Sequence, residues 1–389
     1  MKKKIAIIGA SYLQVPLIKK AKEMGLETHV FAWRVGDEGE EIADFFYPIS
    51  IVEKEKILYK CREIGIDGIC SISSDLATTT VCYIAQKMKL TSNTIECSHK
   101  TTNKFLMREC FKENHDPSPS YLLIKDSENY LDVVNKSAFN FPVIVKPTDR
   151  SGSRGVKKCF SISELPLAIE NAKECSFKKE IIIEEYIEGQ EYSIESISYN
   201  GEHTVLNITY KITTGSPHFI ETGHIEPAPL SDLAKEKIIN VTKHALNSLG
   251  IRYGASHTEV KVDKSGNINI IEIGARMGGD MIGSHLIQLS TGFDFVKAEI
   301  QIALGKKPVI YFNSMNKYAA IKYIINEQDI KQYNDIKRTN PGMIVLADVT
   351  DSLNKNVSDS SNRNGYYIVV SNSIEKVSHC FPNEKIVKI

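Results

Sequence analysis

Short apolar runs alternate with amphipathic segments through the first hundred residues. The apolar runs end at glycine or at polar turns, which is typical of buried strands. The segments between them carry apolar side chains at helical spacing and end at glycine or after a capping residue. Strands that alternate with helices predict a parallel sheet covered on both faces. The predicted strands are residues 5–8, 26–32 and 68–72, and the predicted helices are residues 16–24, 53–64 and 74–88.

The pattern changes in the rest of the chain, where strand-like runs follow one another closely. Residues 192–199 and 203–213 predict a hairpin around Asn200-Gly201, and residues 231–249 form the clearest helix, with Ser231 as its cap. Residues 215–229 hold several polar side chains with little periodicity, so we expect a loop there. Further strands are predicted at 141–147, 255–263, 268–274, 318–325, 342–349 and 366–370.

Composition narrows the class of protein without identifying it. The chain has 389 residues, which favours two or three domains, and 48 basic residues balance 48 acidic ones. This balance gives no basic field for nucleic acid or for an anionic membrane. No apolar run is long enough to span a bilayer, and the lysine-rich start leads into a strand, so we expect a cytoplasmic protein. The eight cysteines are scattered, which favours reduced thiols.

The first strand is followed by only one glycine of the GxGxxG fingerprint, Gly9. Side chains at the other two positions would keep a pyrophosphate away, so no dinucleotide site is predicted. Four polar residues still lie where strands end and helices begin. They could touch a small ligand at that edge of the sheet, or they could be helix caps and turn residues. These residues are Ser11, Ser73, Ser74 and Asp75.

A lysine and a glycine-rich loop follow the strand at residues 141–147. Lys146 stands near the end of that strand, and residues 148–156 (Thr-Asp-Arg-Ser-Gly-Ser-Arg-Gly-Val) join it to a second strand. A Walker loop joins a strand to a helix and is absent. A glycine- and serine-rich hairpin can instead cover phosphates with its amides and hydroxyls, above a lysine charge. The alternative is a simple turn.

An acidic segment follows at residues 180–193. An apolar strand ends in Glu184 and Glu185, a glycine turn follows, and a second strand begins near Glu191. An extended chain could offer its backbone groups to a purine, and a nearby carboxylate could accept ribose hydroxyls. A hairpin with a solvated acidic face is the alternative.

Two carboxylates are predicted to face each other on the strands at 255–263 and 268–274. If residues 264–267 form a four-residue hairpin loop, Asp263 pairs with Ile268 and Glu259 lies opposite Glu272. Like charges about 5 Å apart repel, so they need a cation between them or a proton on one of them. Oxygen ligands of this kind suit Mg²⁺, or Mn²⁺ in its place, together with nucleotide phosphates. A three-residue loop would put the two acids on opposite faces.

The order of these elements resembles that of the ATP-grasp ligases, and among them most closely the carboxylate–amine ligases, including L-amino acid ligases. The resemblance covers almost the whole chain. It implies an N-terminal α/β domain (1–115), a lid subdomain (116–187) and a catalytic subdomain with a terminal sheet extension (188–389). ATP would lie between the lid and a mixed antiparallel sheet.

Carried over position by position, the resemblance implies roles for particular residues. The ATP-binding residues would be Lys104, Lys146, Ser151, Gly152, Ser153, Gly155, Val156, Glu184, Glu185, Tyr186, Ile187 and Glu191, and the metal ligands Glu259 and Glu272. Arg276 would project on the face of Glu272 if the strand continued, and could stabilise an acyl phosphate. Lys211 and His224 are further catalytic candidates, although His224 could equally be a surface histidine. Many relatives carry an asparagine ligand where this chain has Gly274.

These expectations favour an ATP-dependent ligase that joins a carboxylate to an amine, both small molecules and most simply amino acids. No covalent nucleophile is needed for such a reaction. An ATP-dependent carboxylase subunit that phosphorylates bicarbonate, or a nucleotide-binding module without turnover, remain as alternatives. Neither nucleic acid nor a membrane is an expected partner, and a homodimer is one possible assembly.

Overall fold

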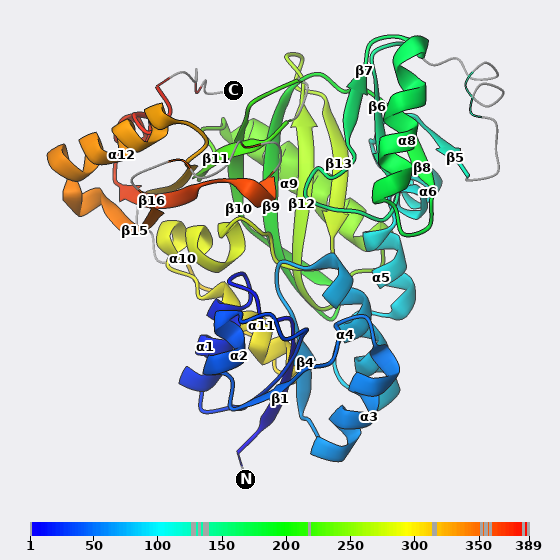
Figure 1. Ribbon diagram of the computed structural model, residues 1–389, viewed down its shortest axis with the longest axis vertical. Helices are drawn as coiled ribbons and strands as arrows, with labels where there is room; N and C mark the ends of the chain where they lie inside the picture. Colours follow the sequence, from blue (N-terminus) through cyan, green and yellow to red (C-terminus); the bar gives the residue numbers. More distant parts are fainter. Residues whose placement is uncertain are drawn as a thin grey trace.

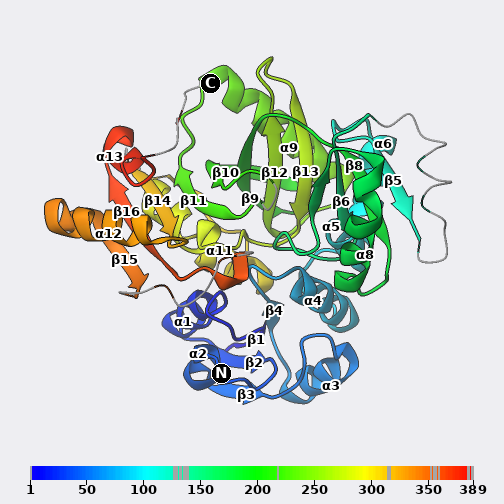
Figure 2. The same cartoon turned by 45° about the horizontal axis from the view of Figure 1, so that its top comes forward.

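The structure is a computed structural model, and its described residues form three β-sheets (Figure 1). It describes residues 2–125, 130, 134, 140–216, 219–312, 317–350, 353, 357, 360–382 and 386. The N-terminal sheet lies at one end of the molecule, and the other two sheets lie side by side above it (Figure 2).

The N-terminal sheet is parallel, with strand order β3-β2-β1-β4. Helices follow its strands in the alternation that the sequence predicts. Its strands are β1 (Lys4–Ile8), β2 (Glu27–Phe31), β3 (Phe45–Tyr47) and β4 (Gly68–Cys70), and its helices are α1 (Val15–Glu23), α2 (Glu38–Ile42), α3 (Lys54–Ile64) and α4 (Asp75–Met88). The predicted α/β fold class is therefore confirmed for this part.

Both faces of this sheet are buried, because alternate residues of each strand point to opposite sides. Ala6 and Ile8 pack against α3 and α4, whereas Ile5 and Ile7 pack against α1 and α11 (Phe295–Ala303). Helix α11 comes from late in the chain and lies beside the N-terminal strands (Figure 1). The N-terminal sheet therefore needs the later part of the chain to complete its core. The division at residues 115 and 187 stays a prediction.

The second sheet is antiparallel, with order β5-β8-β6-β7. Its strands are β5 (Tyr121–Ile124), β6 (Val143–Pro147), β7 (Lys157–Cys159) and β8 (Ile181–Glu185), and helix α8 (Leu165–Cys175) packs on one side. This sheet corresponds to the predicted lid. The helices α5 (Ile95–Thr102) and α6 (Lys104–Glu113) connect the N-terminal sheet to it.

The third sheet has eight antiparallel strands in the order β13-β12-β9-β10-β11-β14-β16-β15. One face is apolar and packs against α9 (Asp232–Ser248), with Tyr192 and Ile194 of β9 in its core. The opposite face carries the alternate residues, such as Ser193 and Glu195. The strands are β9 (Gln190–Tyr199), β10 (Glu202–Thr213), β11 (Glu221–Glu226), β12 (Gly254–Val262), β13 (Ile268–Gly274), β14 (Tyr318–Tyr323), β15 (Ile344–Val349) and β16 (Gly365–Ser371).

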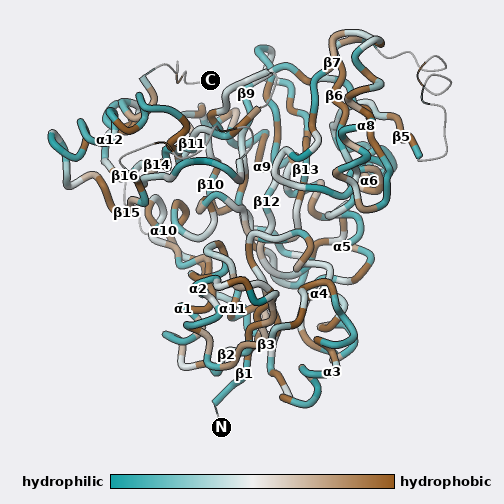
Figure 3. Tube along the Cα trace, viewed as in Figure 1, coloured by the Kyte–Doolittle hydropathy of each residue, from teal (hydrophilic) through white to brown (hydrophobic). Residues whose placement is uncertain are grey.

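The remaining described α-helices and a π-helical turn pack against strands β10, β14, β15 and β16 of this sheet. Hydrophobic residues follow the buried strands, whereas α12 is largely hydrophilic (Figure 3). These helices are a π-helical turn (Ile282–Leu286), α10 (Ile287–Thr291), α12 (Glu327–Thr339) and α13 (Ile374–Ser378). Among the described residues, no helix is long and apolar enough to cross a membrane.

Two expectations for the third sheet are wrong in part. The expected loop at 215–229 contains strand β11, which lies between β10 and β14 in the middle of the sheet; residues 217 and 218 lie outside the described ranges. Strand β13 ends at Gly274, so Arg276 lies beyond it and not on its face.

We predict that Glu226→Gln removes a pH dependence of stability. Glu226 is buried in β11 and accepts hydrogen bonds from Ser290 Oγ (2.7 Å) and Thr209 Oγ1 (2.9 Å), and burial raises its pKa to about 7. Because this pKa lies above the unfolded value of about 4.3, the wild-type protein loses stability as pH rises from there towards 7. The loss is on the order of 3 kcal/mol. Thermal unfolding at pH 4.5 and 8 should show a loss in Glu226→Gln that is smaller than in the wild type by about this amount, while Glu299, whose pKa burial also raises to about 7, keeps its own contribution. An exposed control, Glu202→Gln, should behave as the wild type.

Candidate functional site

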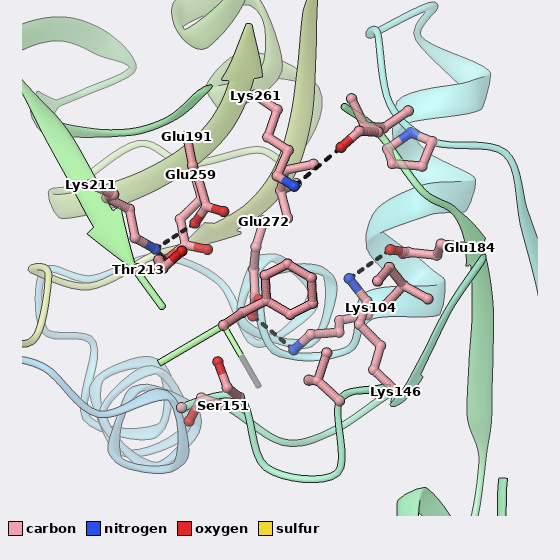
Figure 4. A pocket seen from close by; sticks show the side chains of 18 of the residues that line it. Lys104, Lys146, Ser151, Glu184, Glu191, Lys211, Thr213, Glu259, Lys261 and Glu272 are labelled. Atoms are coloured by element: carbon pink, nitrogen blue, oxygen red, sulfur yellow. Dashed lines mark hydrogen bonds and ion pairs between the residues drawn. The ribbon is translucent and has the colours of Figure 1, made fainter. Parts of the chain in front are cut away.

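A cavity opens between the lid sheet, the eight-stranded sheet and the start of α6. Most of the residues singled out from the sequence line it, including both predicted metal ligands and both predicted phosphate lysines. Figure 4 shows their side chains converging from these elements. The predicted residues on its wall are Lys104, Lys146, Ser151, Gly152, Ser153, Val156, Glu184, Glu185, Tyr186, Ile187, Glu191, Lys211, Glu259, Glu272 and Arg276.

The two central acids are cross-strand partners, since Glu259 of β12 pairs with Glu272 of β13. The expected pairing at the turn is wrong by one residue, because Val262 and not Asp263 pairs with Ile268. A bulge between Glu259 and Val260 shifts the register back. The predicted opposition of the acids is therefore present, although the hairpin reaches it by a different route.

Each of these acids is held by a lysine (Figure 4). Lys211 Nζ lies 2.9 Å from Glu259 Oε1, and Lys104 Nζ lies 2.9 Å from Glu272 Oε1. Lys104 is the first residue of α6, whose N-terminus is capped by the Asn103 side chain, and its Nζ also donates to the Arg150 carbonyl at 2.6 Å. The cap and the helix thus fix the direction from which Lys104 enters the cavity.

Lys211 joins the predicted metal end of the cavity to the predicted ribose end. Its Nζ lies 2.6 Å from Glu191 as well as near Glu259. Burial alone would lower the pKa of Lys211, but the carboxylates of Glu191, Glu259 and Glu221 outweigh burial and raise it well above its ordinary value. Lys211 therefore stays protonated and acts as a cation, so it cannot serve as a base.

Lys146 and Glu184 form a buried ion pair that the sequence did not indicate. Lys146 Nζ lies 2.6 Å from Glu184 Oε2, and Arg108 Nε lies 2.9 Å from Glu184 Oε1. The Glu184 carboxylate thus forms ion pairs with two cations. Only the backbone groups of Glu184 are left to bind adenine in the predicted hinge. Arg108 was not predicted as a site residue. It lies four residues after Lys104, so both side chains lie on one face of α6, and this spacing could have indicated it.

The opposite end of the cavity is aromatic. Tyr186 follows β8 and has Lys158 Nζ 3.3 Å and Lys261 Nζ 4.8 Å from its ring centroid. Lys261 also donates to the Ile187 carbonyl at 3.1 Å. Phe219 lines the same end, and neither it nor Lys261 was predicted. Gly155 of the predicted flap is not on the cavity wall, because it packs against Ala172 and Cys175 of α8.

A second polar cluster surrounds Asp280, which follows the Gly278-Gly279 pair. Arg363 donates to both carboxylate oxygens of Asp280, at 2.6 and 2.9 Å, and His224 Nε2 lies 3.4 Å away. His224 is buried in β11, so the surface alternative for it is wrong, and it does not line the main cavity. No described residue hydrogen-bonds to its Nδ1. Arg363 was missed, because the C-terminal segment shows no recognisable motif.

The donor set fits a magnesium ion that is also bound by phosphates. Among the described residues, no group of three or more His, Cys, Asp or Glu side chains is arranged to hold a metal. Glu259 and Glu272 nevertheless face one cavity, and Mg²⁺ is commonly bound by one or two carboxylates plus substrate phosphates.

Comparison with known proteins agrees with this geometry. Residues 139–284 match the family model of the ATP-grasp domain. Residues 139–284 therefore belong to the ATP-grasp superfamily, and the resemblance seen in the sequence is confirmed.

Individual relatives are distant. The chain is 25% identical over 358 residues to alanine–anticapsin ligase of Bacillus subtilis (strain 168), covering 82% of this chain and 74% of that protein. The matches span about half to three quarters of the length of the first curated relatives.

Solved structures show the same fold over almost the whole chain. L-amino acid ligase from Bacillus licheniformis superposes with a TM-score of 0.80 at 22% identity, covering 98% of this chain and 96% of that one. The biotin carboxylase domain of Hydrogenobacter thermophilus 2-oxoglutarate carboxylase, in complex with MgADP, ADP and bicarbonate, superposes with a TM-score of 0.75 at 19% identity, covering 100% and 91%. The predicted fold class is confirmed for the whole chain.

Proposed function

We propose that this protein is an ATP-dependent carboxylate–amine ligase that forms an amide or peptide bond through an acyl phosphate. The observation that carries the proposal is the pair Glu259 and Glu272, opposed in register at one cavity and each held by a lysine. A divalent cation bound together with nucleotide phosphates would neutralise the two carboxylates.

The nucleotide end of the cavity suits ATP. The backbone of residues 185–187 would offer hydrogen bonds to the adenine edge, and the ring of Tyr186 supplies an apolar wall. Glu191 would accept the ribose hydroxyls. Lys104 and Lys146 would meet the phosphates from below, and the amides and hydroxyls of Ser151, Gly152 and Ser153 would cover them from the flap.

The end of the cavity that holds Glu259 and Glu272 suits phosphoryl transfer. Glu259 and Glu272 would hold Mg²⁺, which when bound neutralises charge on the phosphates. A substrate carboxylate oxygen attacks the γ-phosphorus, ADP leaves, and an acyl phosphate forms. Lys104 moves from Glu272 to the transferred phosphoryl group in this proposal, because its Nζ already lies within reach of that end.

Amide formation then needs charge stabilisation at the acyl carbon. The amine nitrogen attacks this carbon, a proton leaves the nitrogen, and the bond from carbon to the phosphate oxygen breaks. Arg276 lines the cavity beside Glu272 and would stabilise the oxyanion and the departing phosphate. His224 would help to bind the amine together with Asp280, which lies near its Nε2. Its Nδ1 makes no hydrogen bond with the described residues and would remain available to a substrate.

The similarity to alanine–anticapsin ligase and to L-amino acid ligase supports amino acids as the two substrates. The bicarbonate in the carboxylase domain of similar fold favours one alternative, a carboxylase that works through carboxyphosphate.

A product test separates these functions. ADP release measured over pairs of amino acids and small carboxylates should rise at least tenfold above background for some pair, with a new amide detected by mass spectrometry. It should not depend on bicarbonate. ADP release that needs bicarbonate would favour the carboxylase, and no release with any pair, with ATP still bound, would favour the binding module.

A further inference from the structure

A side chain at residue 274 would crowd the guanidinium of Arg276. A Cβ atom at Gly274 would lie 3.1 Å from Arg276 Nε, 3.2 Å from its Cζ and 3.2 Å from Asp75 Oδ1. The space that a side chain at position 274 would occupy is thus filled by an arginine and its counter-ion. No left-handed backbone angle demands glycine there. The space itself is therefore what Gly274 provides.

The counter-ion of Arg276 is Asp75, which comes from a helix that packs on the N-terminal sheet. Asp75 is the first residue of α4, and its Oδ1 accepts from Arg276 Nε at 2.8 Å, with Oδ2 3.4 Å from Nη2. The two side chains are largely buried, with 16% and 14% of their surfaces exposed. Burial would raise the pKa of Asp75, but the Arg276 guanidinium outweighs it and keeps this carboxyl ionised.

Backbone contacts hold the two segments together. Ser73 N donates to the Met277 carbonyl at 3.2 Å, and Ser73 Oγ donates to the Gly278 carbonyl at 3.0 Å. The turn before α4 is thus fastened to the segment after β13, and Asp75 meets Arg276 at a fixed distance. The helix cap is a separate residue, because the Ser74 side chain accepts from Ala77 N.

We propose that Asp75 is a positioning residue for the ligase reaction, which holds Arg276 in the space left by Gly274 and aims it at the acyl phosphate. The inference rests on the proposed function and adds to it that the reaction requires Asp75. Helix α4 of the N-terminal part of the chain thereby supplies part of the reaction centre.

Two substitutions test the proposal through kinetics. Asp75→Asn should lower kcat at least tenfold and change KM for ATP less than twofold, because it releases Arg276 and leaves the nucleotide end intact. Gly274→Ala should lower kcat about three- to tenfold without loss of thermal stability, since alanine suits a strand end but displaces the guanidinium by a few tenths of an ångström. Glu96→Gln, at a first-turn acid of α5 that pairs with Lys100 on the surface, is the control and should match the wild type.

A double-variant cycle separates positioning from a merely structural role. In an Arg276→Ala background, Asp75→Asn should lower kcat by less than a further twofold, because its partner is already absent. A fully additive loss, or a kcat for Asp75→Asn within twofold of the wild type, would overturn the proposal.

One readout does not depend on turnover. The Nε–H resonance of Arg276, assigned with Arg276→Lys, should shift and exchange faster with solvent in Asp75→Asn. If no substrate pair releases ADP but this resonance responds, the proposed function fails while the contact stands. An unchanged resonance would show that Asp75 does not hold the guanidinium.

Discussion

Glu272→Gln is expected to lower the rate of ADP release at least about 10³-fold while the protein stays folded. Glutamine keeps the size of the side chain and can still accept a hydrogen bond from Lys104, whose Nζ lies 2.9 Å from Glu272 Oε1. It removes the negative charge that would hold Mg²⁺ opposite Glu259. The rate is measured with the best substrate pair, and folding by circular dichroism and the thermal unfolding midpoint.

A binding measurement accompanies this rate. Calorimetric titration of the ADP-bound variant with Mg²⁺ or Mn²⁺ should show a metal affinity reduced about tenfold or more. Glu259→Gln should behave in the same way, whereas Glu202→Gln, on the exposed end of β10, should match the wild type. Full activity of Glu272→Gln would remove this residue from the proposed metal site.

Glu184→Gln is expected to destabilise the lid sheet by about 3–5 kcal/mol. The substitution leaves Lys146 and Arg108 buried without the carboxylate that lies 2.6 and 2.9 Å from them. A buried ion pair adds little net stability, but the loss of one partner leaves uncompensated charge. Native-state hydrogen exchange of the β6 and β8 amides measures the change in the lid itself.

A matched control is the next residue in the same strand. Glu185 is exposed, and Glu185→Gln should change the same exchange free energies by less than about 0.5 kcal/mol. An equal effect in both variants would show that the Glu184 ion pair is not what stabilises the lid.

The pH dependence of the Glu184 contribution has a defined sign. Burial would raise the pKa of Glu184, but Arg108 and Lys146 outweigh it and lower the pKa below its ordinary value. The carboxylate therefore stabilises the lid above the unfolded value of about 4.3, and this stabilisation is lost as pH falls through the folded value. The difference between wild type and Glu184→Gln should thus shrink below about pH 4.

Local patterns predicted most of the elements, because burial of alternate or helically spaced apolar residues leaves a trace in the sequence. Strand β11 was not predicted from the sequence, and there is a physical reason for this. It contains Gly223, His224 and Glu226, which are unusual in a strand, and its pairing with β10 and β14 decides its conformation. A Cβ at Gly223 would meet the Phe381 ring at 2.3 Å, so the glycine serves close packing and not a loop.

The sequence by itself determined the fold class and the order of the phosphate and acid elements. It indicated that Glu259 and Glu272 could face each other, but the bulge that brings them opposite each other is seen only in the structure. Only the tertiary structure decided which charges meet. Lys104 lies 168 residues from Glu272, and Asp75 lies 201 residues from Arg276. A pattern of period 2 or 3.6 shows which face a side chain takes, but it carries no information about what another sheet brings to that face. The partners of Glu184, Asp280 and Arg276 therefore follow from how strands and helices that are distant in the sequence pack together.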